Sequence, residues 1–98
     1  MQDVLIFVPA SNQEEAKQYA TDLIKQKLAF VVRITKDVYQ LWLENGGIGS
    51  DTITVLRIRT AKNLIDKVKQ YFANNHKWGK NNYCFEVIEL NVESKMPM

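Results

Sequence analysis

An Asn-Gly-Gly turn separates two long strand-like segments, and the first of these changes its pattern half-way. Its apolar residues occupy even positions up to Ile34 and odd positions from Tyr39 onward. One regular strand cannot keep a single buried face through that change, so a bulge or short break is expected near Lys36-Asp37. Asn45-Gly46-Gly47 supplies residues that tolerate the positive φ angles of a hairpin turn. The pattern predicts a hairpin whose outer half extends, as an arm, beyond the domain's own core.

Two further segments have the composition of strands. The apolar run from Val4 to Val8 predicts a strand covered on both faces, and Pro9 is expected to end it because proline has no N–H for the ladder. A last strand is expected over residues 83–92, before a loose tail.

Two segments carry apolar residues at a helical period. The first predicts a helix over about residues 12–28, with Ser11 and Glu14 forming a capping box at its start. The second predicts a helix that begins at Thr60 and ends at Asn74-Asn75.

The resulting order is β-α-β-β-α-β. With right-handed crossovers and one hairpin, this order gives an antiparallel sheet. Both helices then lie on one face, and the first and third strands lie in the centre. A chain of 98 residues is one domain by length. The predicted fold is therefore a single α+β domain over residues 1–98, a ferredoxin-like βαββαβ sandwich with a long β-hairpin arm.

Charge and composition argue against several classes of protein. A net charge of +2 is weak evidence for phosphate binding, and residues 52–59 lack the aromatic side chains of an RNA-recognition strand, so no nucleic-acid partner is expected. One cysteine forms no internal disulfide. The longest apolar run, residues 4–10, is too short for a bilayer and has no basic segment before it, so we expect a cytoplasmic protein without a membrane partner.

The arm carries large apolar side chains that a small domain has difficulty covering, namely Tyr39, Leu41, Trp42 and Leu43. A two-stranded extension exposes both of its faces. Two interpretations are open: copies of the chain cover the arm by self-association, or the helices of the same chain cover it.

Three residues could together bind a transition metal: His76, Cys84 and Glu86. Imidazole, thiolate and carboxylate suit copper or zinc, and Cys84 and Glu86 share one strand face. The hypothesis predicts weak Cu(II) binding that is lost in His76→Ala. The alternative is structural: a solvated His76, a small buried Cys84 and a Glu86 that takes part in an ion pair. Because Glu86 ends an apolar strand face, it is expected either at the mouth of a cleft or paired with Arg57 or Arg59.

No pattern of a catalytic site or phosphate loop is present in the sequence. There is no Ser-His-Asp arrangement or GxGxxG motif, and the glycines of residues 46–49 sit at a hairpin turn, not before a helix. We therefore expect no enzymatic activity.

Residues 4–34, VLIFVPASNQEEAKQYATDLIKQKLAFVVRI, resemble the opening of the CutA divalent-ion-tolerance family. The shared pattern is a strand ending in V-P, a helix with E-E-A, and K-L-A before an apolar strand. The likeness continues more weakly through Trp42, Gly46 and the Thr60 region to the last strand. Val31 and Glu44 stand where the family tends to have cysteine and tryptophan, and residues 79–82 are additional.

The resemblance implies a ferredoxin-like subunit of a tight homotrimer, with arms pairing between subunits, in the cytoplasm or an organelle. It implies a role in divalent cation tolerance, copper being the cation in the family's label. The family is also similar in architecture to the PII signalling proteins. The alternative function is thus a PII-like regulatory trimer that senses a small molecule without metal chemistry. A trimeric scaffold for a protein partner is a third possibility.

Overall fold

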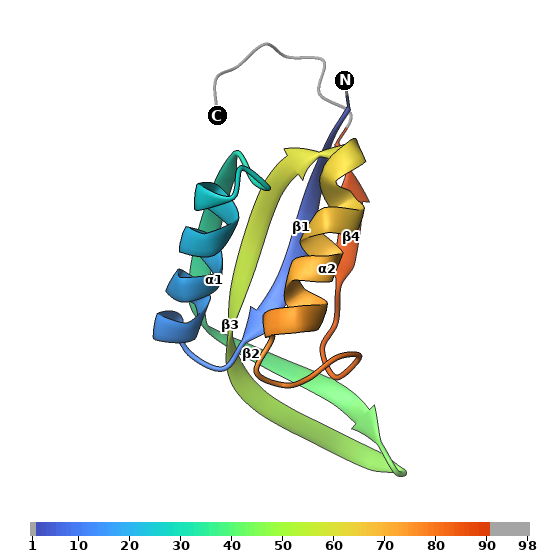
Figure 1. Cartoon of the computed structure of the whole chain (residues 1–98). Coiled ribbons are helices and arrows are strands. Elements are labelled where there is room, and N and C mark those ends of the chain that lie inside the picture. The colour runs from blue at the N-terminus through green and yellow to red at the C-terminus, as the bar shows by residue number, and fades with distance from the viewer. Residues whose placement is uncertain (1, 91–98) are drawn as a thin grey trace.

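The computed structural model describes residues 2–90 and contains one four-stranded antiparallel sheet with the order β2-β3-β1-β4. The elements are β1 (Asp3–Ala10), α1 (Gln13–Lys25), β2 (Val31–Glu44), β3 (Gly47–Ala61), a 3₁₀ turn (Lys62–Leu64), α2 (Ile65–Asn75) and β4 (Glu86–Glu89). Both helices lie on one side of the sheet, and the β2–β3 hairpin extends beyond them (Figure 1). The ferredoxin-like α+β fold and the central position of β1 and β3 are confirmed.

The core lies between the helices and the facing side of the sheet. Alternate residues of β1 and β3 and one stripe of each helix are fully buried there, with Phe72, Ile6, Leu23, Leu56 and Ile58 as the largest side chains. β1 alternates between buried and partly buried residues, so the prediction that both of its faces are covered was wrong. The sheet face opposite the helices, which we call the open face, is only partly shielded.

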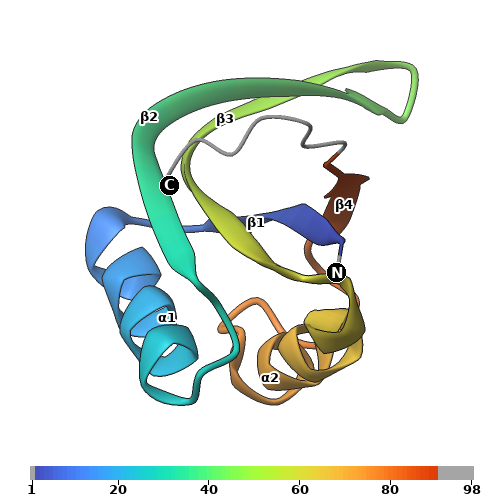
Figure 2. The ribbon, with the colours of Figure 1, turned by 90° about the horizontal axis from the view of Figure 1, so that it is seen from above.

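The predicted bulge in β2 is confirmed. The register between β2 and β3 shifts between Thr35 and Val38, and Asp37 takes a φ of 59°. At the tip, Asn45 and Gly46 have φ angles of 39° and 82°, as a tight hairpin turn requires. The arm beyond the bulge then curves toward the open face, as Figure 2 shows.

Several element boundaries differ from the predicted ones. Pro9 does not end β1 but pairs with Val55 of β3. On the other edge of β1, β4 pairs only as far as Phe7, so no strand there needs the N–H that Pro9 lacks. β4 itself is shorter than predicted; residues 91–92 lie outside the described residues.

The helix boundaries differ as well. Asn12, not Ser11, caps α1 by accepting a hydrogen bond from the Glu15 N–H, and the helix ends at Lys25 because Lys27 adopts a left-handed φ of 59°. Thr60 does not cap α2. It is fully buried in β3, and its hydroxyl donates to the Leu28 carbonyl at 2.7 Å.

A groove between the arm and the sheet as the candidate functional site

The bulge at Asp37 determines which arm residues face the rest of the domain. Before it, Val32 and Ile34 face the helices; after it, the even residues of β2 turn to the open face. Val38, Gln40 and Trp42 line the concave side of the arm, and Tyr39, Leu41 and Leu43 are left on the convex side. One irregular position thus creates both a groove and an exposed apolar surface.

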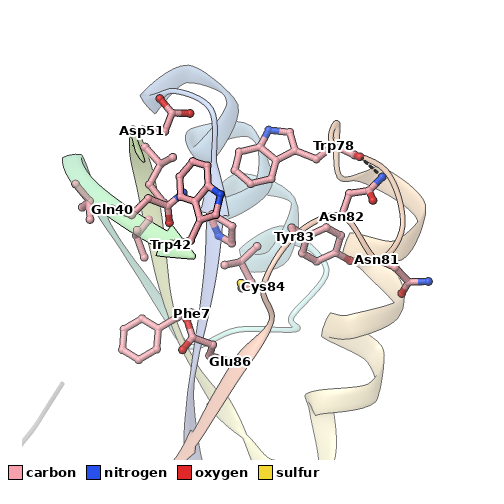
Figure 3. Close-up of a pocket in the computed structure, with 15 residues that line it drawn as sticks. Phe7, Gln40, Trp42, Asp51, Trp78, Asn81, Asn82, Tyr83, Cys84 and Glu86 are labelled. Carbon is pink, nitrogen blue, oxygen red and sulfur yellow. Dashed lines mark hydrogen bonds between the residues drawn. The ribbon is translucent and has the colours of Figure 1, made fainter. Parts of the chain in front are cut away.

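The groove has a volume of about 840 Å³ and runs between the arm, β1 and the segment that leads into β4. Its lining mixes aromatic and polar side chains, among them Phe7, Gln40, Trp42, Asp51, Trp78, Asn82, Tyr83, Cys84 and Glu86 (Figure 3). Volumes of this size and mostly apolar linings with a few polar groups are typical of small-molecule sites.

Trp42 forms the arm side of the groove, and a glycine makes room for it. Gly49 is its cross-strand partner, and a Cβ built on Gly49 would lie 2.4 Å from the Trp42 Cε2 atom. The indole ring therefore lies directly against the backbone of β3. This contact explains why Gly49 is buried although the residues around it in the arm are exposed.

Trp78 forms the opposite side of the groove and is fixed by two hydrogen bonds. Its indole Nε1–H donates to the Ser11 hydroxyl at 2.6 Å, and its carbonyl accepts from the Asn82 side-chain amide at 2.9 Å (Figure 3). The loop after α2 is thereby tied to the loop before α1. Sequence reasoning did not select Trp78, although a tryptophan in an otherwise polar loop was a usable signal.

His76 lies in the interior behind this loop and is only 6% exposed. Its Nε2–H donates to the Pro9 carbonyl at 2.7 Å, and its Nδ1 accepts the Trp78 backbone N–H at 3.1 Å. The ring also stacks on Tyr83 at a centroid distance of 4.1 Å and on Tyr19 at 5.3 Å. Neither nitrogen of the ring retains a free lone pair for a metal ion.

The other two members of the proposed metal set lie elsewhere. Cys84 and Glu86 are both exposed and both line the groove. Within residues 2–90, no group of three or more His, Cys, Asp or Glu side chains is arranged to hold a metal ion. The structure thus brings Cys84 and Glu86 together and leaves His76 apart, so a three-residue copper site is not assembled within the described part of one chain.

The structural alternatives for these residues also need correction. His76 is buried and not solvated, and Cys84 is exposed and not buried. Arg59, one of the two expected partners of Glu86, pairs with Asp3 instead at 3.0 Å. Among residues 2–90, Glu86 forms no ion pair.

Three tyrosines, two on the helices and one before β4, have altered acidity. Burial is the main cause that raises the pKa of Tyr19, of Tyr71 and of Tyr83. For Tyr71 a second cause is the 2.6 Å hydrogen bond that its hydroxyl donates to Asp22, since ionisation would place two negative charges side by side. Their hydroxyls therefore serve as neutral hydrogen-bonding groups; that of Tyr19 accepts the Lys77 N–H at 2.9 Å.

The convex face of the arm is the most exposed apolar surface in the described chain. Leu43 is 87% exposed, Ile48 77%, Tyr39 66% and Leu41 63%, and Leu43 and Ile48 are direct cross-strand partners. Neither helix reaches them (Figure 1). The second interpretation, in which the helices of the same chain cover the arm, is therefore wrong for the single chain.

Comparison with known proteins relates this arrangement to a family. Residues 4–97 match the family model described as CutA1 divalent ion tolerance protein. The chain belongs to this family. It is 27% identical over 75 residues to "Protein CutA 1, chloroplastic" of Oryza sativa subsp. japonica, a match that covers 76% of this chain and 42% of that protein. To "Protein CutA homolog" of Xenopus laevis it is 28% identical over 91 residues, with 93% and 58% covered.

The fold is likewise that of solved CutA structures. CutA1 from Oryza sativa has a TM-score of 0.82 at 25% identity, covering 98% of this chain and 84% of that one. The periplasmic divalent cation tolerance protein CutA from Archaeoglobus fulgidus has a TM-score of 0.84 at 22% identity, with 95% and 88% covered.

The curated CutA relatives are longer than this chain, which spans about two-fifths of the rice protein and under two-thirds of the Xenopus one. The names of the similar proteins give different compartments: the curated rice relative is called chloroplastic, and the solved Archaeoglobus protein is called periplasmic. A cytoplasmic location for this CutA chain therefore stays a prediction. No helix within residues 2–90 is long and apolar enough to cross a membrane.

Proposed function

We propose that this CutA family member is a non-catalytic homotrimer with a role in divalent cation tolerance. The observation that carries the proposal is the convex face of the arm, where Tyr39, Leu41, Leu43 and Ile48 are all more than half exposed. Covering each of these side chains is worth on the order of 1–2 kcal/mol. Contact between copies supplies that cover, whereas the chain's own helices do not reach it.

Sedimentation of the wild-type protein over a concentration series tests the assembly. Three times the mass of one chain is expected, and Leu41→Asp is expected to lower it, because a carboxylate would be buried in the apolar contact. Ile24→Asp is the matched control, since Ile24 is an exposed apolar residue of α1 that lies away from the arm. A wild type that sediments as a monomer at every concentration contradicts the proposal.

The copper part of the proposal concerns Cys84 and Glu86, whose side chains lie two positions apart on the same groove wall. A thiolate and a carboxylate are two donors for Cu(II), and further donors would come from water or from another copy of the chain. We expect micromolar or weaker binding. Because the ring nitrogens of His76 are both engaged, His76 is not included in this two-donor set.

Calorimetric titration with Cu(II) distinguishes this set from the three-residue hypothesis. Cys84→Ser and Glu86→Gln are expected to abolish the binding heat, and His76→Phe, which keeps a ring in the interior, is expected to retain it. Loss of binding in His76→Phe with a folded protein would instead support the three-residue set. No heat in the wild type would rule out the copper role.

The groove itself favours a second candidate, a PII-like regulator that senses a small molecule. The two indole rings of Trp42 and Trp78 and the Gln40, Asp51 and Glu86 side chains offer stacking and hydrogen bonding in about 840 Å³. A ligand that binds the native state raises the thermal midpoint. A thermal-shift screen with nucleotides and small organic acids tests this candidate, and a response that Trp78→Ala removes would support it.

A further inference from the structure

The groove between the arm and the sheet carries charge of one sign. Two acidic side chains line it, Asp51 and Glu86, and no lysine, arginine or histidine of residues 2–90 does so. Both acidic residues are exposed, and neither forms an ion pair within that range. A concave site lined by one sign of charge attracts ligands of the opposite sign. The charge of the groove therefore favours a cation over a nucleotide or an organic acid.

The two carboxylates lie at opposite ends of the groove (Figure 3). Asp51 pairs with Gln40 in the arm, whereas Glu86 pairs with Phe7 at the start of β4. Phe7 also pairs with Arg57, and Asp51 precedes Arg57 by six residues of β3. At about 3.3 Å per residue, a straight strand would separate these two rows by roughly 20 Å, and the curvature of the arm shortens the distance (Figure 2). A ligand that meets both carboxylates is therefore elongated and carries positive charge at each end.

Aromatic rings occupy the walls between the two ends. Trp42 comes from the arm, Trp78 from the loop after α2, and Tyr83 from the segment before β4 (Figure 3). The indole N–H of Trp78 is already donated to the Ser11 hydroxyl, so this ring offers the groove its π system and not a free donor. Aromatic rings attract organic cations and also bury methylene groups. The walls thus suit the middle of an aliphatic amine as well as its charges.

These rings are held in place before any ligand binds. Trp42 lies against the backbone at Gly49, where a Cβ would be 2.4 Å from the ring. Tyr83 stacks on His76 at a centroid distance of 4.1 Å, and Trp78 is fixed by its hydrogen bonds. Side chains that are already ordered lose little conformational freedom on binding, which leaves more of the interaction energy for affinity.

We propose that the groove binds a linear organic polycation of the aliphatic polyamine class. Its end amines would meet the carboxylates of Asp51 and Glu86, and its methylene chain would lie along the aromatic walls. This inference rests on the second candidate function, a groove that senses a small molecule, and names the class of that molecule. Arg57 does not oppose it directly, because Phe7 separates Arg57 from Glu86 and Arg57 does not line the groove.

Calorimetric titration with spermidine at constant ionic strength tests the proposal. Asp51→Asn and Glu86→Gln keep the shape of each side chain and remove its charge. Each is expected to weaken binding about threefold or more, and the double variant about tenfold. Asp66→Asn is the matched control, because Asp66 is an exposed acidic residue in the first turn of α2 that does not line the groove, and it is expected to bind as the wild type does.

Tryptophan emission locates the binding, because the two tryptophans of the chain, Trp42 and Trp78, both line the groove. Spermidine is expected to shift or quench this emission in the wild type. Trp78→Leu is expected to weaken binding about threefold or more in the calorimeter, with circular dichroism to check the fold. Equal affinity of the wild type, Trp78→Leu and the double carboxylate variant would overturn the inference.

Two further probes separate the possible failures. Magnesium ion tests bare charge, and it is not expected to displace spermidine at equal concentration; displacement would overturn the part assigned to the rings. ATP tests the opposite charge. Binding of ATP without binding of spermidine would overturn this inference and leave the sensing of a small molecule standing. No response to spermidine, ATP or the organic acids of the thermal-shift screen would contradict both.

Discussion

Replacing His76 separates a structural role for this residue from a role as a metal ligand. His76→Phe keeps an aromatic ring between Tyr83 and Tyr19 but removes both hydrogen-bonding nitrogens. The buried Pro9 carbonyl then loses the donor that lies 2.7 Å away, and the Trp78 N–H loses its acceptor. One buried group without a partner costs about 1–3 kcal/mol.

The expected loss in unfolding free energy is therefore about 2 kcal/mol for His76→Phe, which lowers the thermal midpoint of so small a domain by roughly 8–16 °C. His76→Ala also removes the ring from its stack, and truncating a buried ring costs about 3–5 kcal/mol. Thermal or urea unfolding, at one protein concentration and without metal, measures both losses. If both variants are as stable as the wild type, the ring nitrogens do not hold the loop, and the reasoning is refuted.

Three further predictions concern other contacts. Gly49→Ala is expected to displace the Trp42 indole, because the new Cβ would lie 2.4 Å from the ring; a red-shifted or more quenchable tryptophan emission would report it, and an unchanged spectrum would contradict it. Asn12→Ala removes the cap of α1 and is expected to cost about 1 kcal/mol in urea unfolding, whereas no change would show that the cap is dispensable. Tyr71 keeps its proton in the folded chain after the unfolded chain has begun to lose it near pH 10, so the free energy of unfolding falls as the pH rises above that value. Tyr71→Phe is expected to flatten this fall, and an equally steep pH dependence in that variant would count against the assignment.

The fold was largely predictable because its determinants are local. The change from even to odd apolar positions located the bulge near Asp37, and Asn45-Gly46 located the turn. The prediction that Pro9 ends β1 was wrong. The missing N–H of Pro9 interrupts the sheet only if β4 extends far enough to pair with it, and no local pattern encodes the length of β4. The capping residue of α1 was misplaced by one position, since Ser11 and Asn12 are both good caps.

The candidate site was less predictable because it depends on contacts between distant segments. His76 stands next to a polar loop, and its burial follows from a hydrogen bond to Pro9, 67 residues away. Glu86 lies beside Phe7, and Phe7 beside Arg57, only through the register of β4, β1 and β3, which apolar patterning specifies within a hairpin but not across a crossover. Residue types alone therefore suggested a metal set that the described part of one chain does not assemble.

The bulge at Asp37 also makes the arm sensitive to insertion and deletion. Removing one residue at this point would let β2 pair with β3 without a bulge, keep Val38, Gln40 and Trp42 on the groove side, and take away the irregularity that bends the arm. A change of three nucleotides would thus straighten the arm and widen the groove while leaving the helices and the core intact. The width of the groove in such a scaffold therefore depends on chain length at one position as much as on the chemistry of its lining.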